Sequence, residues 1–178
     1  MILSADEILK RLIDSGCTGD TPRSENPGAG SPARAIPIPG DRGGREMPCD
    51  GRSLVISPFS RESLQPASYD LRAGEDTTLA RGTCTLLPTR EWVELPHDLA
   101  ATLRCRSSYG RKGIMIGAGY VDPGFRGQLT LCLVNMGPED VEVPVGGRIV
   151  QMIIHEVKGG SALYNGRYQD SQGAVSSR

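Results

Sequence analysis

The sequence predicts an all-β protein, a barrel or sandwich, with one short helix at its N-terminus. Between residues 77 and 103, short apolar runs are separated by Gly, Pro and Asp at a spacing of roughly ten residues, which is typical of β barrels and sandwiches. Residues 128–134 alternate leucines with polar or small side chains. That period of two indicates a strand with one face in the core.

Residues 4–14 are expected to form the helix, ending at Gly16. Ser4 and Glu7 have the spacing of a capping box, in which each residue satisfies a free backbone N–H of the first turn. One face of this helix is apolar and should dock on the sheet. Its residues are Ile8, Leu9, Leu12 and Ile13.

Residues 17–52 differ in character from the rest of the chain. They contain six prolines and seven glycines and almost no bulky aliphatic side chains, so they cannot bury a core of their own. We expect a flexible surface insertion within a single domain of residues 1–178, a length that suits one core.

Composition excludes several classes of protein. The formal net charge of −1 gives no sign of a nucleic-acid or membrane-surface partner. No run of eighteen apolar residues and no signal peptide is evident, which favours a cytoplasmic enzyme. Five cysteines without a CxxC pair, and only two histidines, argue against a disulfide framework and against a zinc deaminase signature.

Two further segments are expected to be strands. Residues 54–59 are apolar, and residues 68–71 then alternate Ser and Asp with Tyr and Leu after an extended Gln-Pro step. Within residues 68–71, Asp70 is expected at the polar edge of the strand. Near the C-terminus, the apolar run 149–154 suits a buried strand.

The segment 105–135 carries the candidate chemistry. Asp122 directly precedes a Pro-Gly turn, which displays its carboxylate at the end of a strand, where it could activate a water molecule. A second motif is a dense set of donors of the kind that binds phosphate oxygens, and it comprises Arg106, Ser107, Ser108 and Arg111. Each motif also has a plain structural interpretation: the Asp-Pro-Gly as a hairpin corner, and the set of donors as a solvated turn.

The order RSS-x-x-R-x-G, then VDPGFRG, then LTLxLxN resembles the dCTP deaminase and dUTPase superfamily of nucleotide enzymes. The resemblance extends to LQPASYDLR and to EWVELPHDLAATLRCRSS. It implies a distorted jelly-roll-like β-barrel and a homotrimer with sites between subunits. The loop 112–121 is shorter than expected for bacterial dCTP deaminases, and its length resembles the archaeal dUTPase branch.

The resemblance also implies site residues. Asp122 would be the catalytic base, and Asp70 would lie near the phosphates and a Mg²⁺ ion, if that ion is not held through the substrate phosphates alone. A mobile C-terminal arm, residues 164–178, would fold over the nucleotide; its GRYQDS resembles the GxYQGS of archaeal dUTPases, with Asp170 in place of a glycine. The expected substrate contacts beyond the phosphate-binding motif are Gly117, Tyr120, Phe125, Thr130, Cys132, Tyr164, Arg167, Tyr168, Gln169 and Ser171.

The expected function is dUTP diphosphatase activity, which hydrolyses dUTP to dUMP and pyrophosphate. Two alternatives stay open at this point: a dCTP deaminase and a non-catalytic nucleotide-binding regulator. Cys132 stands where the related deaminases place a glutamate that handles protons, and a thiol of ordinary pKa is a poor substitute for that carboxylate. The sequence therefore favours hydrolysis.

Overall fold

The computed structural model describes residues 1–12, 53–159 and 162–177, so the expected insertion at residues 17–52 lies outside the described residues. Strands dominate, which confirms the predicted all-β class. The helical elements are α1 (Ala5–Arg11), the 3₁₀ turn η1 (Arg61–Ser63) and α2 (Ser107–Gly110). The strands are β1 (Val55–Ser57), β2 (Leu64–Gln65), β3 (Ser68–Arg72), β4 (Thr77–Leu79), β5 (Cys84–Glu94), β6 (Leu99–Cys105), β7 (Ile114–Ile116), β8 (Tyr120–Val121), β9 (Arg126–Asn135), β10 (Val141–Val143) and β11 (Arg148–Glu156).

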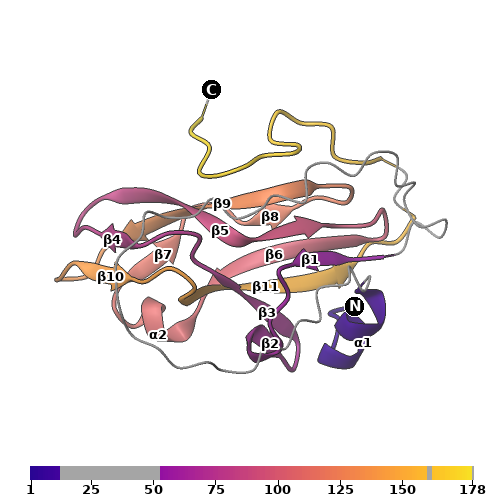
Figure 1. The fold of residues 1–178 in the computed structure, drawn as a ribbon, viewed down its shortest axis with the longest axis horizontal. Helices are drawn as coiled ribbons and strands as arrows, with labels where there is room; N and C mark the ends of the chain where they lie inside the picture. Colours follow the sequence, from indigo (N-terminus) through magenta and orange to yellow (C-terminus); the bar gives the residue numbers. More distant parts are fainter. Residues whose placement is uncertain (13–52, 160–161, 178) are drawn as a thin grey trace, which may run out of the picture.

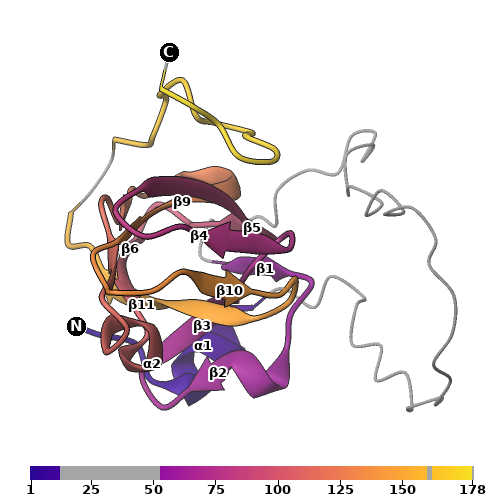
Figure 2. The same ribbon diagram turned by 90° about the vertical axis from the view of Figure 1, so that its left-hand side faces the viewer.

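Two antiparallel sheets face each other across the core (Figures 1 and 2). One has the strand order β1-β5-β9-β7, the other the order β2-β3-β11-β6-β8, and β10 and β4 form a small third sheet. Within the described residues the sheets do not close into a barrel, so the expected barrel is corrected to an open, jelly-roll-like pair of sheets. The edge strands of the two sheets are only two or three residues long, too short to form a hydrogen-bond ladder with the edge of the facing sheet. They are β1, β7, β2 and β8.

The long strand β9 shows the predicted division into an inner and an outer face. Leu131 and Leu133 are fully buried and Leu129 is nearly so. The intervening Gln128, Thr130 and Cys132 are partly exposed on the outer face. The leucines stabilise the core because each removes a large apolar surface from water, an effect of about 1.5–3 kcal/mol per side chain.

Helix α1 is shorter than the expected residues 4–14. Its start matches the prediction, since the Ser4 hydroxyl accepts a hydrogen bond from the Glu7 amide at 3.3 Å. Its end comes at Arg11 because Leu12 turns to an extended conformation and forms a parallel bridge with Leu54. None of the helices in the described part of the chain is long and apolar enough to span a membrane.

Candidate active site

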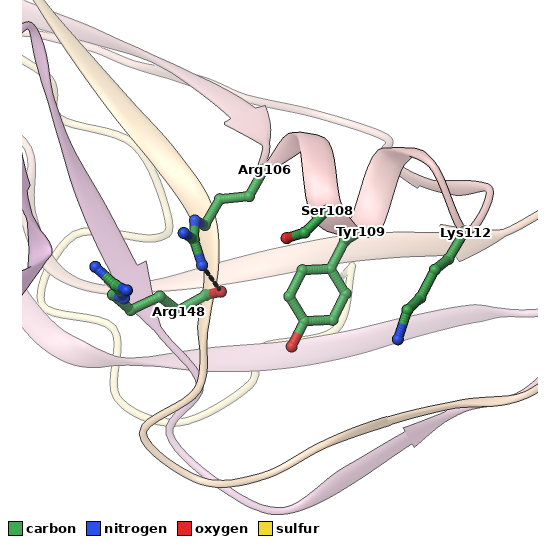
Figure 3. Close-up of a pocket in the computed structure, with 5 residues that line it drawn as sticks. All are labelled: Arg106, Ser108, Tyr109, Lys112 and Arg148. Atoms are coloured by element: carbon green, nitrogen blue, oxygen red, sulfur yellow. Dashed lines mark hydrogen bonds between the residues drawn. The ribbon is translucent and has the colours of Figure 1, made fainter.

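The phosphate-binding motif lies where β6 ends and the single turn of α2 begins. Arg106 is the residue before this turn, and its side chain points toward Arg148 (Figure 3). Its Nη1 donates to the Arg148 carbonyl oxygen at 3.0 Å, and its Nε lies 3.0 Å from Asp70 Oδ2. Ser107, Ser108 and Arg111 are exposed around it. The arginine is thus fixed by the fold, whereas the other three donors face solvent.

Asp70 is buried beneath two arginines, at 1% exposure, and is not at a solvated strand edge. Besides Arg106, the Arg148 Nη1 lies 3.8 Å from the same Oδ2 oxygen. Neither carboxylate oxygen accepts a well-aligned hydrogen bond from the described residues, so the ion pair with Arg106 is close but poorly directed. Burial raises the pKa of Asp70, and the charges of Arg106 and Arg148 act in the opposite direction.

A pocket of about 310 Å³ opens beside this cluster. Figure 3 shows that its basic side chains come from separate elements, with Arg148 on β11 and Lys112 just after α2. Lys112 Nζ also lies 5.9 Å from the centre of the Tyr109 ring. Three cationic groups and a serine hydroxyl around an open pocket suit a phosphate-bearing anion. The lining residues are Arg106, Ser108, Tyr109, Lys112 and Arg148.

Asp122 lies in the turn after β8 and is exposed, as the sequence predicts. The turn is held by the Gly124 amide, which donates to the Leu95 carbonyl at 3.0 Å, and by the Phe125 amide, which donates to the Asp122 carbonyl at 3.2 Å. Phe125 is only 6% exposed. Its ring contacts the Tyr164 ring edge to face, with centroids 5.8 Å apart. The carboxylate is thus presented on a turn whose backbone is anchored to the core.

The C-terminal arm lies along the outside of β9, on the side of the molecule away from α1 (Figure 1). Over residues 126–131 this edge of β9 is not paired with β7, which pairs only with the last three residues of the strand. Gly127 and Ser171 form a parallel bridge there, and the Gln128 amide donates to the Ser171 carbonyl at 2.9 Å. A side chain at Gly127 would collide with Ser171, because an added Cβ would lie 2.9 Å from its Oγ.

Besides Tyr164, the arm residues expected to contact substrate divide into two groups. Gln169 and Ser171 are engaged with their own chain: the Gln169 Nε2 donates to the Gly124 carbonyl at 2.8 Å, and the Ser171 hydroxyl donates to the Gln128 carbonyl at 2.7 Å. Arg167 and Tyr168 are exposed. The side chains of the second group are therefore accessible to solvent.

Of the remaining expected contacts, Thr130 and Cys132 lie near the middle of β9, whereas Gly117 follows β7 and Tyr120 lies on β8. The Thr130 hydroxyl accepts from the Val175 amide of the arm at 3.0 Å. Cys132 accepts, through its carbonyl oxygen, a bond of 2.8 Å from the Gly117 amide. Tyr120, on β8, is 64% exposed. Gly117 and Cys132 thus come together, while Tyr120 lies next to Asp122.

The phosphate-binding motif and Asp122 are not brought together within one chain. Val121 pairs with Ala101 on β6, and Arg106 follows Ala101 by five residues. At about 3.3 Å per residue, the strand separates the two groups by about 17 Å. The two groups therefore lie near opposite ends of β6 within one chain.

The carboxylates of this region suit a magnesium ion that is bound together with a triphosphate better than an ion held by the protein alone. In the described residues, no group of three or more His, Cys, Asp or Glu side chains is arranged to hold a metal. Asp70 faces two guanidinium groups, an environment that disfavours a cation. Asp122 is an exposed carboxylate, and Mg²⁺ commonly takes one or two carboxylates together with substrate phosphates.

The fold is that of the dUTPase-like jelly rolls. A native dUTPase of EIAV superposes with a TM-score of 0.53 at 20% identity, covering 65% of this chain and 98% of that one. A dUTPase from phage phi11 of S. aureus, described with a structural Mg(II) ion, superposes with a TM-score of 0.51 at 18% identity over 67% of this chain and 99% of that one.

The sequence comparisons define the family. The family described as dCTP deaminase-like matches residues 73–157. A dCTP deaminase of Thermococcus kodakarensis is 37% identical over 137 residues, which cover 68% of this chain and 88% of that protein. A dUMP-forming dCTP deaminase of Methanopyrus kandleri is 36% identical over 143 residues, 58% of this chain and 74% of that protein. The chain belongs to the dCTP deaminase family.

Several residues around the candidate site carried no signal in the sequence. Arg148 and Lys112 flank the anion pocket, and Arg126 binds Asp170 of the arm. Arg148 follows two glycines and directly precedes the apolar run 149–154 that was predicted as a strand, so only its charge could have drawn attention. Cys84, which contacts Cys132, is more than forty positions away from it in sequence and was predictable only from the strand register.

Proposed function

We propose that the protein is a dUTP diphosphatase that converts dUTP to dUMP and pyrophosphate. One observation carries the proposal: the ten residues of β9, Arg126–Asn135, include no Asp, Glu or His. Deamination at C4 of cytosine needs a group that can take and return protons, and the resemblance to the deaminases implies a glutamate for this role at the position of Cys132 on β9. Cys132 does not offer one, because its contact with Cys84 and its burial raise the pKa of its thiol.

Asp122 acts as the general base. It removes a proton from a water molecule while the water oxygen forms a bond to the α-phosphorus of dUTP. The bond from that phosphorus to the bridging oxygen breaks in line, and the negative charge passes to the leaving pyrophosphate. The expected phosphate ligands Arg106, Ser107, Ser108 and Arg111 stabilise this charge. Fixed donors of this kind supply much of the catalysis in phosphoryl transfer.

Magnesium is the proposed cofactor and would arrive with the triphosphate. When bound, it neutralises charge on the phosphate oxygens. Asp122 is the exposed carboxylate nearest to the proposed reaction, whereas Asp70 serves to position Arg106 and Arg148 beneath the anion pocket.

The active site is shared between copies of the chain, in a homotrimer. The support for this proposal is the separation of about 17 Å along β6 between Arg106 and the Asp122 turn, set by about 3.3 Å per strand residue. In a ring of identical subunits, the anion pocket of one copy can face the Asp122 turn of the next. In this arrangement, Arg167 and Tyr168 of the arm contact the nucleotide. Phe125 packs against the sugar, and Gly117 and Tyr120 lie beside the base.

Mixing two inactive variants tests the shared site. Arg106→Gln and Asp122→Asn subunits, unfolded together and refolded in equal amounts, should recover about a quarter of wild-type activity, because random mixing pairs two intact halves in about one interface of four. Each variant refolded alone is the control. Recovery no greater than the sum of the two controls would contradict a shared site.

dCTP deaminase activity is the second candidate, because both archaeal relatives carry that name and one is described as dUMP-forming. Purified protein is incubated with magnesium and either dUTP or dCTP, and dUMP, dUTP, pyrophosphate and ammonia are quantified. The proposal predicts pyrophosphate and dUMP from dUTP, with no ammonia from dCTP. Ammonia release from dCTP at a rate comparable to dUTP hydrolysis would assign the protein to the deaminases.

A further inference from the structure

Two free thiols meet on the outer face of the sheet that contains β5 and β9. Cys84 Sγ and Cys132 Sγ are 3.2 Å apart, and both cysteines are unbridged. In the register of the two strands, Cys84 pairs with Val134 and Cys132 pairs with Leu86, so the cysteines are diagonal neighbours. Cys84 is exposed and Cys132 is partly exposed. The pair is therefore accessible from solvent through Cys84.

The Cys132 thiol is packed against the loop that carries Gly117. An added Cβ at Gly117 would lie 3.1 Å from Cys132 Sγ, so the sulfur lies directly beside the glycine backbone. A structural metal site would need about four ligands. Among the described residues, no third Cys, His, Asp or Glu joins the pair into such a group, which leaves thiol chemistry as the property of this site.

We propose that Cys84 and Cys132 are a thiol-oxidation site, at which a low-molecular-weight disulfide such as glutathione disulfide forms a reversible intramolecular disulfide. The thiolate of one cysteine attacks the oxidant, a mixed disulfide forms, and one glutathione thiol leaves. The second cysteine then attacks the sulfur of the first and releases the second glutathione thiol. Two protein thiols are oxidised and one glutathione disulfide is reduced to two thiols, which carry away the two protons.

The geometry sets the order of these steps and the lability of the product. Cys84 is the first to attack the oxidant, because it is exposed whereas Cys132 is partly covered. The sulfurs must approach from 3.2 Å to a bond length of about 2.05 Å, which small side-chain rotations can supply. The bond would form at an exposed position, and exposed disulfides are readily reduced.

Oxidation is expected to slow turnover. A bond to Cys84 pulls the Cys132 sulfur away from Gly117, whose loop borders the base in the proposed diphosphatase site. This effect on rate rests on the proposed function, whereas formation of the disulfide does not.

Peptide mapping tests the site itself. The full-length protein is incubated with glutathione disulfide, alkylated and digested with trypsin without reduction. The expected product is a linked pair of peptides, residues 82–90 and 127–148, which separates after dithiothreitol treatment. Cys84→Ser should abolish the linked pair, and the matched Cys105→Ser control should retain it. Links that involve only Cys17 or Cys49, or no link at all, would overturn the proposal.

A trapping variant tests the order. In Cys132→Ser, the reaction should stop with one glutathione on Cys84, because the second thiol is missing. A Cys84 that stays unmodified under these conditions would contradict its role as the first thiol.

Activity assays test the link to the proposed function. Oxidised wild-type protein should hydrolyse dUTP several-fold more slowly and recover with dithiothreitol, while Cys84→Ser should respond to neither reagent. A quantitative disulfide with an unchanged rate would overturn the coupling to the site. A protein without dUTP hydrolysis, oxidised or reduced, would overturn the proposed function but leave the mapping result intact.

Discussion

Asp170 holds the C-terminal arm on β9 in a conformation that favours glycine. Its backbone φ is +58°, in the left-handed region. Both of its carboxylate oxygens bind the Arg126 guanidinium, and the longer of the two contacts, from Nη2, measures 2.7 Å. Two opposing effects follow, because the backbone conformation costs free energy and the ion pair offsets that cost.

Substitutions at Asp170 separate these effects. A non-glycine residue in the left-handed region costs about 1–2 kcal/mol relative to glycine. The side chains of Arg126 and Asp170 are 47% and 50% exposed, so solvent screens their pair. Such a pair contributes about 0.2–1 kcal/mol. Asp170→Ala loses the pair and keeps the strain, whereas Asp170→Gly loses both, so the two variants should differ in arm docking by about 1–2 kcal/mol, or about 5- to 30-fold.

Amide hydrogen exchange reports this difference directly. The amides of Gly173 and Val175 donate to Gln128 and Thr130 on β9 and are protected only while the arm is docked. They should exchange fastest in Asp170→Ala and at least as slowly in Asp170→Gly as in the wild type. Amides of β11 serve as the internal control. Equal exchange in the alanine and glycine variants would refute the reasoning, since it would leave no strain to relieve.

Three further outcomes are expected. Arg126 lowers the pKa of Asp170, so the ion pair should stabilise arm docking fully above the ordinary carboxyl pKa of about 3.9, and docking should weaken as pH falls through the lowered value. The NMR chemical shifts of the arm amides should follow this transition in the wild type and show none in Asp170→Asn. Glu91 is fully buried and pairs with Arg72, so Glu91→Ala should lower the free energy of unfolding, measured in urea, by about 3–5 kcal/mol. Glu91→Gln should lower it by less, and a loss below about 1 kcal/mol for the alanine variant would contradict a stabilising role for this ion pair. Truncation before Tyr164 should raise KM and lower kcat for dUTP together, and an unchanged kcat would rule out closure by the arm.

Much of the fold follows from short-range patterns. The alternation of leucines along β9 predicted which residues enter the core, and the Ser4 cap predicted where α1 begins. The helix end could not be predicted in the same way, because it depends on a bridge to Leu54, far along the chain. Barrel closure was wrongly expected for a similar reason, since it depends on how far the outer strands extend beside distant partners.

The candidate site was predictable in part. Asp122 is displayed in its turn as the local Asp-Pro-Gly motif indicates. The burial of Asp70 was missed, because the arginines that cover it come from the ends of β6 and from β11. The engagement of Gln169 with the Gly124 carbonyl and of Ser171 with β9 was missed as well. A sequence pattern states which side chains are suited to bind a ligand, but neighbours in space decide which of them are already occupied.

The role of Asp122 is the central claim of the proposed mechanism, and the turnover of Asp122→Asn tests it most directly. The amide keeps the shape of the carboxylate but cannot accept the proton, so kcat for dUTP should fall by about 10²–10⁴-fold. Affinity for a non-hydrolysable dUTP analogue, measured by calorimetry on the same preparation, should stay unchanged. Asp140→Asn, which alters an exposed carboxylate in another turn, is the matched control and should keep wild-type turnover. Near-normal turnover of Asp122→Asn would contradict the account.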